Sequence, residues 1–154
     1  MWMRKFGTLS DKQIDQFVQV LGIPNYLGCI AKNQLPSHRV YGWYIVNLQS
    51  ENEGDGRGTH WVYVGVQPPF ATYFDSFGQP MPEVVARFLA GLRVFENHEI
   101  YQSLSSHMCG WFCLYLAYQQ FKLRRTFVDI VSGFNSRYPS HNDSILKSYF
   151  LKLL

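Results

Sequence analysis

Two cysteines, Cys109 and Cys113, lie one helical turn apart in the apolar segment CGWFCLYLAYQQF. Ser105 and Ser106 precede this segment and are typical of helix starts, so Cys109 is expected in or beside the first helical turn. There the positive end of the helix dipole and the free N–H groups stabilise a thiolate, the nucleophilic form of cysteine. Cys113 lies deeper in the apolar helix, where burial raises the pKa of a thiol. The segment therefore predicts one reactive cysteine, Cys109, and one inert core cysteine.

A histidine and an aspartate are expected on one face of two neighbouring strands. His60 lies near the start of a strand predicted over Thr59–Gln67, and Asp75 near the end of one predicted over Ala71–Ser76. The turn between the strands centres either on Pro68-Pro69 or one residue earlier, so Asp75 lies diagonally or directly opposite His60. In both registers the side chains are within reach of each other. A carboxylate behind an imidazole fixes its tautomer and stabilises the imidazolium, which is the orienting half of a catalytic triad.

Acyl transfer also needs hydrogen-bond donors for the oxyanion that develops on the substrate carbonyl. Gln102 lies seven residues before Cys109, at the end of a short strand predicted over His98–Gln102. Its amide could donate alongside the backbone N–H of Cys109. Gly110 has no side chain and lets the backbone approach a substrate carbonyl closely.

In their order and spacing these residues resemble the adenovirus protease (adenain) family. The matching motifs are His60-Trp61, Asp75 within FDSFG, Gln102, and Cys109 within CGWFC. The order His, acid, Gln, Cys also occurs in the wider clan of ubiquitin-like-protein proteases. The motifs cover about residues 40–120 well and both ends weakly. The resemblance implies that Cys109 is the nucleophile, His60 the general base, Asp75 the orienting acid and Gln102 the oxyanion donor, with no metal.

The resemblance also implies a substrate and partners. Such enzymes cut viral structural precursor proteins after glycine in small-residue motifs, within a narrow groove, and Trp61 is expected to form one wall of that groove. They act in the host nucleus and the virion. They are stimulated by DNA and by a viral peptide that a disulfide joins to a cysteine between the acid and the Gln. This sequence has no cysteine between Asp75 and Cys109, so DNA and a noncovalent peptide are the activators to consider. It also has Asp75 where the adenovirus enzymes usually have Glu; the relatives that cut ubiquitin-like modifiers use Asp.

Several helices and strands must position these side chains. Apolar residues at helical spacing follow Ser10 and stop at Gly22, which predicts a helix. The other expected elements are a strand over Val40–Leu48, a polar glycine-rich loop over Glu51–Gly58, a helix from Pro82 towards Val94, the Cys109 helix to about Lys122, and helices over Thr126–Val131 and Asp143–Leu153. Strands in succession with helices at both ends predict an α+β fold with a central, mostly antiparallel sheet. The resemblance adds that the Cys109 helix packs against the sheet bearing His60 and Asp75.

Length and composition place limits on the class of protein. The 154 residues predict a single domain over residues 1–154, and 47% hydrophobic residues supply an ample core. No signal peptide and no apolar run long enough to cross a membrane is visible, and three cysteines make no disulfide framework. We therefore expect an intracellular, unsecreted protein, monomeric and without membrane contact. The net charge of +3 suits ordinary solubility and also a weak attraction to DNA.

Three alternative functions remain open from the sequence. The runner-up is a protease of host ubiquitin or ubiquitin-like modifiers. The second is an inactive protease-fold protein that binds DNA or a capsid. The third is a zinc site made of Cys109, Cys113, His107 and His60, which lacks the paired ligand motifs usual in structural zinc sites.

Overall fold

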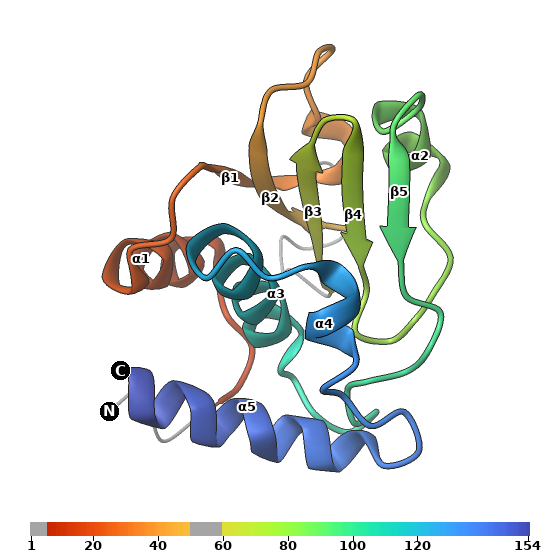
Figure 1. The fold of residues 1–154 in the computed structure, drawn as a ribbon. Coiled ribbons are helices and arrows are strands. Elements are labelled where there is room, and N and C mark those ends of the chain that lie inside the picture. Colours follow the sequence, from red (N-terminus) through yellow and green to blue (C-terminus); the bar gives the residue numbers. More distant parts are fainter. Residues whose placement is uncertain (1–5, 50–59) are drawn as a thin grey trace.

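One five-stranded sheet forms the centre of the computed structural model, which describes residues 6–49 and 60–154 (Figure 1). The strands follow each other in chain order across the sheet: β1 (Tyr26–Ala31), β2 (Gly42–Asn47), β3 (Trp61–Gln67), β4 (Phe70–Phe74) and β5 (Arg93–Glu96). The central pairs β2–β3 and β3–β4 are antiparallel, and the outer pairs β1–β2 and β4–β5 are parallel.

Helices cover both faces of this sheet. They are α1 (Asp11–Leu21), the 3₁₀ turn η2 (Lys32–Gln34), α2 (Glu83–Phe88), α3 (Cys109–Ala117) with its π-helical continuation η3 (Tyr118–Lys122), α4 (Phe127–Val131) and α5 (Pro139–Leu153). One face of the sheet shares an apolar core with α1, α3, α4 and α5, and the opposite face packs against α2. Alternation along β3 separates the two cores, because Trp61 and Tyr63 enter the first while Val62 and Val64 enter the second. Among the described residues, no helix has both the length and the apolar character needed to span a bilayer.

The predicted α+β fold with helices at both ends is confirmed, and several boundaries are confirmed with it. Ser10 caps α1 through a capping box with Gln13, and Gly22 ends the helix in the left-handed conformation with φ of 64°. The apolar segment that starts at Cys109 is helical throughout, as α3 followed by η3. The helix predicted over 143–153 begins earlier, at Pro139. The predicted loop over 51–58 lies outside the described residues.

Three expectations for the sheet and its surroundings were wrong. The sheet is mixed rather than mostly antiparallel, because the two outer strands, β1 and β5, pair in parallel with their neighbours. Neither outer strand was predicted from the sequence. The helix predicted towards Val94 ends at Phe88, since Gly91 adopts a left-handed φ of 89° and the chain then enters β5. No strand forms over His98–Gln102, whose backbone follows β5 as irregular chain.

The register of the β3–β4 hairpin decides how His60 meets Asp75. Tyr63 pairs with Phe74 and Gln67 with Phe70, so the turn centres on Pro68-Pro69. Of the two registers that the sequence allowed, this one places Asp75 diagonally across from His60.

A tight turn directly after β4 fixes Asp75 and the residue that follows it. Gly78 has a left-handed φ of 65°, and its N–H donates to the Asp75 carbonyl at 2.8 Å. A Cβ at this position would lie 2.6 Å from the Glu99 carbonyl oxygen and 2.7 Å from that of His98. Backbone atoms cannot move aside as a flexible side chain can.

We therefore expect Gly78→Ala to lower the free energy of unfolding by about 2 kcal/mol or more, because it combines left-handed strain with a backbone clash. Urea denaturation measures the difference. Gly133→Ala is the matched control, since its Cβ would meet only the Ile130 carbonyl oxygen at an ordinary 3.5 Å. An equal and small effect for both variants would contradict the strain at Gly78.

Candidate active site

Cys109 is the first residue of α3, as the sequence predicted, although the cap differs from the expectation. Met108 occupies the N-cap position, and it makes no capping hydrogen bond through its side chain. Ser105 and Ser106 lie before the cap, so they do not begin the helix. The Cys109 side chain is therefore at the helix end whose N–H groups and partial positive charge favour an anion.

Helix α3 is fixed by apolar packing along nearly its whole surface. Every residue of the helix except Tyr115 is buried. Its neighbours are β2 and β3 of the sheet, α1 and α5. Such an apolar helix has no solvent face, so packing on all sides holds the position of Cys109.

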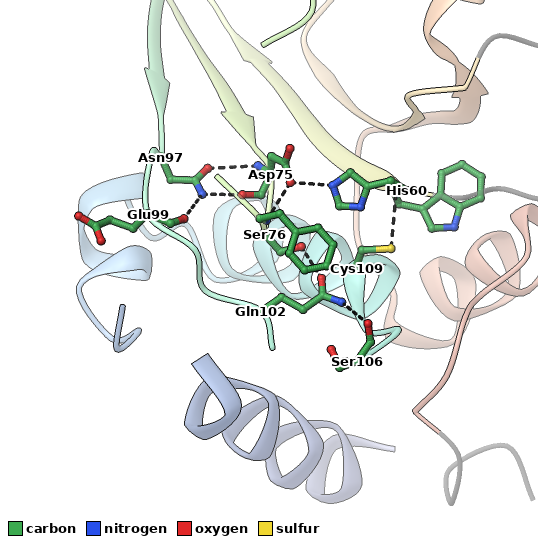
Figure 2. A network of polar contacts seen from close by, with 10 residues as sticks. His60, Asp75, Ser76, Asn97, Glu99, Gln102, Ser106 and Cys109 are labelled. Carbon is green, nitrogen blue, oxygen red and sulfur yellow. Dashed lines mark hydrogen bonds and ion pairs between the residues drawn. The ribbon is translucent and has the colours of Figure 1, made fainter. Parts of the chain in front are cut away.

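His60 and Asp75 form a close pair at the end of the β3–β4 hairpin (Figure 2). The His60 Nε2 lies 2.6 Å from the Asp75 Oδ1. A carboxylate can only accept, so His60 donates from Nε2, and the neutral ring then has Nδ1 as its acceptor. That nitrogen is buried and makes no hydrogen bond with the described residues. Nδ1 is therefore the ring atom that can take up a proton.

The sulfur of Cys109 lies beside this histidine. The backbone N–H of Trp61, the residue after His60, donates to the Cys109 Sγ at 3.5 Å. Burial lowers the pKa of His60, but the hydrogen bond to Asp75 and the interaction with Cys109 raise it more, to about 9. The surroundings of His60 thus favour the imidazolium, which is the charge state that pairs with a thiolate.

Two residues that sequence reasoning missed hold this pair in place. Asn97 binds the backbone of Asp75 twice: its Nδ2 donates to the Asp75 carbonyl at 2.6 Å, and its Oδ1 accepts from the Asp75 N–H at 3.1 Å. Phe77 stacks on the His60 ring with centroids 5.0 Å apart, and its N–H donates to the Asp75 Oδ1 at 2.8 Å. Asn97 lies outside the motifs, and Phe77, although it lies within FDSFG, had been given no role, so only the fold could reveal these contacts.

Gln102 is brought to the same site by the chain that leads into α3. Its side chain is buried, and its Nε2 donates to the Ser106 carbonyl at 3.0 Å, just before the Cys109 helix turn (Figure 2). An amide nitrogen carries two hydrogens, so one remains for another acceptor. The four residues predicted to be catalytic, His60, Asp75, Gln102 and Cys109, therefore meet in one place.

Trp61 and Gly110, which were expected to contact substrate, are both buried in the core. The Trp61 indole donates to the Leu9 carbonyl at 2.9 Å, and a Cβ on Gly110 would lie 3.2 Å from the Leu9 side chain. Trp111 donates in the same way to the Gly7 carbonyl at 3.3 Å. Trp61 and Gly110 thus both lie against the N-terminal segment at Leu9, and their role in substrate binding stays a prediction.

The other two cysteines lie in surroundings unsuited to a nucleophile. Cys113 is 1% exposed, and burial raises its pKa well above the ordinary value. Cys29 lies half-buried on β1, and burial followed by the charge of Asp15 raises its pKa too. Within residues 6–49 and 60–154, no three His, Cys, Asp or Glu side chains come together as a metal site, so the four residues considered for zinc are not grouped as ligands.

Comparisons with known proteins extend this picture at the level of the fold. No protein-family model and no curated protein matches the sequence. The crystal structure of the ASFV pS273R protease matches with a TM-score of 0.61 over 91% of this chain and 67% of the protease chain, at 15% identity. A second crystal structure of that protease, in selenomethionine form, gives a TM-score of 0.55 at 12% identity with the same coverage. The chain thus has a fold similar to that of this viral protease.

Proposed function

We propose that this chain is a cysteine endopeptidase with Cys109 as its nucleophile. The single observation that carries the proposal is the His60–Asp75 pair at 2.6 Å, set beside a cysteine at the N-terminus of a buried helix. The similarity of the fold to the ASFV pS273R protease supports it. An inactive binding protein would not need this arrangement of base, acid and thiol, so we favour an enzyme.

The chemistry follows from the positions of the four side chains. His60 Nδ1 accepts the proton of the Cys109 thiol, and the thiolate attacks the carbonyl carbon of the scissile peptide bond. The second Gln102 amide hydrogen and the Cys109 backbone N–H donate to the oxyanion. The His60 imidazolium then protonates the amine as the C–N bond breaks, which leaves a thioester on Cys109. His60 next takes a proton from water, the hydroxide cleaves the thioester, and the acid product and the free thiol are released.

For the substrate, we propose viral precursor proteins with glycine near the scissile bond. This assignment rests on the resemblance of the His60-Trp61, FDSFG and CGWFC motifs to adenovirus protease. Ubiquitin-like modifiers are the second candidate, because enzymes of the same clan cut them with an Asp at the position of Asp75.

A panel of glycine-containing peptides tests both proposals in one assay. It should include viral-type small-residue motifs and the C-terminal tails of ubiquitin-like modifiers, each with wild type and Cys109→Ala. Cleavage of the first group by wild type alone supports a maturation protease, and preferential cleavage of modifier tails supports the second candidate. If wild type and Cys109→Ala are equally inert towards the whole panel, the proposed activity is wrong. Adding DNA at low salt to the same assay tests whether DNA stimulates cleavage.

Gln102→Ala should lower kcat by about 10²-fold or more while KM changes little, because an oxyanion donor acts mainly in the transition state. Steady-state kinetics on the best peptide of the panel measure this effect. The matched control is Gln119→Ala, a buried glutamine that bonds Tyr149 and Arg125 away from the site. An unchanged kcat in a folded Gln102→Ala protein would exclude the oxyanion role.

A further inference from the structure

Ser76 contacts the proposed oxyanion residue through a buried hydrogen bond that the reaction as described does not use. Its hydroxyl donates to the Gln102 Oε1 at 2.5 Å (Figure 2). Both residues are 1% exposed, so water does not compete for this bond. Ser76 directly follows Asp75, so one dipeptide contacts both the base and the oxyanion amide.

The backbone of Ser76 also binds the segment that contains Gln102, independently of the Ser76 hydroxyl. The Ser76 carbonyl accepts from the Tyr101 N–H at 2.8 Å and from the Gln102 N–H at 3.0 Å. From the other side, the buried Asn142 of α5 donates to the Tyr101 carbonyl at 3.0 Å. The path of the chain around Gln102 is therefore fixed by main-chain contacts, which remain when the Ser76 hydroxyl is removed.

What the hydroxyl adds is a second hydrogen bond to the amide, at its oxygen, which limits rotation of the amide plane. The two ends of a glutamine amide are nearly equal in shape, so hydrogen-bond partners decide which end is the NH₂ group. The Ser106 carbonyl can only accept, and it takes one Nε2 hydrogen. The Ser76 hydroxyl occupies the Oε1 end. With the oxygen and the nitrogen of the amide each held by a hydrogen bond, the remaining Nε2 hydrogen has a fixed direction.

We propose that Ser76 is a positioning residue for catalysis, which orients the Gln102 amide as an oxyanion donor. This inference rests on the proposed peptidase function. It extends that function by connecting the turn after β4 to the oxyanion site through adjacent residues, so that Asp75 orients the base and Ser76 orients the donor.

The proposal is tested with Ser76→Ala alone and in a Gln102→Ala background, on the best glycine peptide. We expect Ser76→Ala to lower kcat about 10-fold with little change in KM, less than the full loss of a donor. In the Gln102→Ala background the same substitution should change kcat by less than 2-fold, since no amide is left to orient. Equal kcat losses in both backgrounds would show a merely structural role and overturn the proposal.

Two further measurements separate this inference from the proposed function. A peptide aldehyde ending in glycinal forms a hemithioacetal with an oxyanion-like oxygen, so it should bind Ser76→Ala about 10-fold more weakly than wild type. Iodoacetamide alkylation of Cys109 develops no oxyanion, and its rate should be unchanged. A parallel loss in both reactions would mean that Ser76 acts on the thiol and not on Gln102. Absence of Cys109-dependent cleavage in wild type would instead reject the peptidase itself.

Should Ser76→Ala fail to fold, Ser76→Cys supplies the second variant. A thiol is a weaker donor of similar size, so kcat should fall between wild type and Gln102→Ala. A folded Ser76→Cys protein with wild-type kcat and wild-type aldehyde affinity would contradict the need for the hydroxyl.

Discussion

Cys109→Ala should abolish peptide cleavage, with a loss of at least about 10⁴-fold in kcat, because no other group can form the thioester. Cys113→Ala is the matched control. It removes a thiol only one helical turn away, yet it should keep kcat within a few-fold, since Cys113 lies fully inside the core. Steady-state kinetics on a cleavable glycine peptide, with urea denaturation to confirm folding, measure both variants.

Labelling by iodoacetamide gives an independent view of the same assignment. At neutral pH the reagent should modify Cys109 first, because burial raises the pKa of Cys113 and of Cys29 and leaves these two as neutral thiols. Mass spectrometry of the digested protein locates the label. Preferential labelling of either other cysteine, or loss of cleavage in Cys113→Ala but not in Cys109→Ala, would refute Cys109 as the nucleophile.

Asp75→Asn should lower kcat by about 10³–10⁴-fold and also move the pH dependence of the enzyme. Burial lowers the pKa of His60, and the contacts with Asp75 and Cys109, of which the hydrogen bond to Asp75 contributes most, raise it to about 9. Without the carboxylate the pKa of His60 falls, so the alkaline limb of the kcat/KM profile should move from near pH 9 towards lower pH. A pH–rate profile of both proteins measures this shift.

The free energy of unfolding should also depend on the protonation of His60. A histidine whose pKa is raised on folding stabilises the fold fully below its unfolded value of about 6.5, and this stabilisation is lost as the pH rises through about 9. Asp75→Asn should therefore cost more free energy of unfolding at pH 6 than at pH 10. Asp129→Asn, which changes an exposed aspartate on α4, is the control and should show no such difference. A destabilisation of Asp75→Asn that is equal at both pH values would exclude the ion pair as its cause.

The meeting of His60 with Asp75 could be predicted because it depends on local rules. Side chains alternate along a strand, and a hairpin of either register keeps both residues on one face. The choice between registers was not available from the sequence, since it depends on which residues the turn takes up at Pro68-Pro69. The structure settles it by pairing Gln67 with Phe70.

The contacts that hold the site could not be predicted, because they join segments that lie far apart in the sequence through one or two hydrogen bonds each. Asn97 follows β5, an edge strand that pairs only with β4 among the described strands. With four residues, β5 is too short for its alternation of side chains to be recognised in the sequence. Ser76 lies in a turn and reaches Gln102 across 26 positions of sequence. No periodicity encodes such distances, and the residue types alone suggest ordinary turn chemistry.

The burial of α3 also has a consequence for motion. Local opening of a protein begins where few apolar contacts must be broken, and such openings cost much less than complete unfolding. Helix α3 is the opposite case, since all of its residues except Tyr115 are buried. The amide hydrogens from Phe112 onward, which are bonded within the helix, should accordingly exchange with solvent only through rare openings of the molecule. If Cys109 is the nucleophile proposed above, it is thus attached to a helix that rarely opens, and we expect the movements that accompany substrate binding in the segments around it.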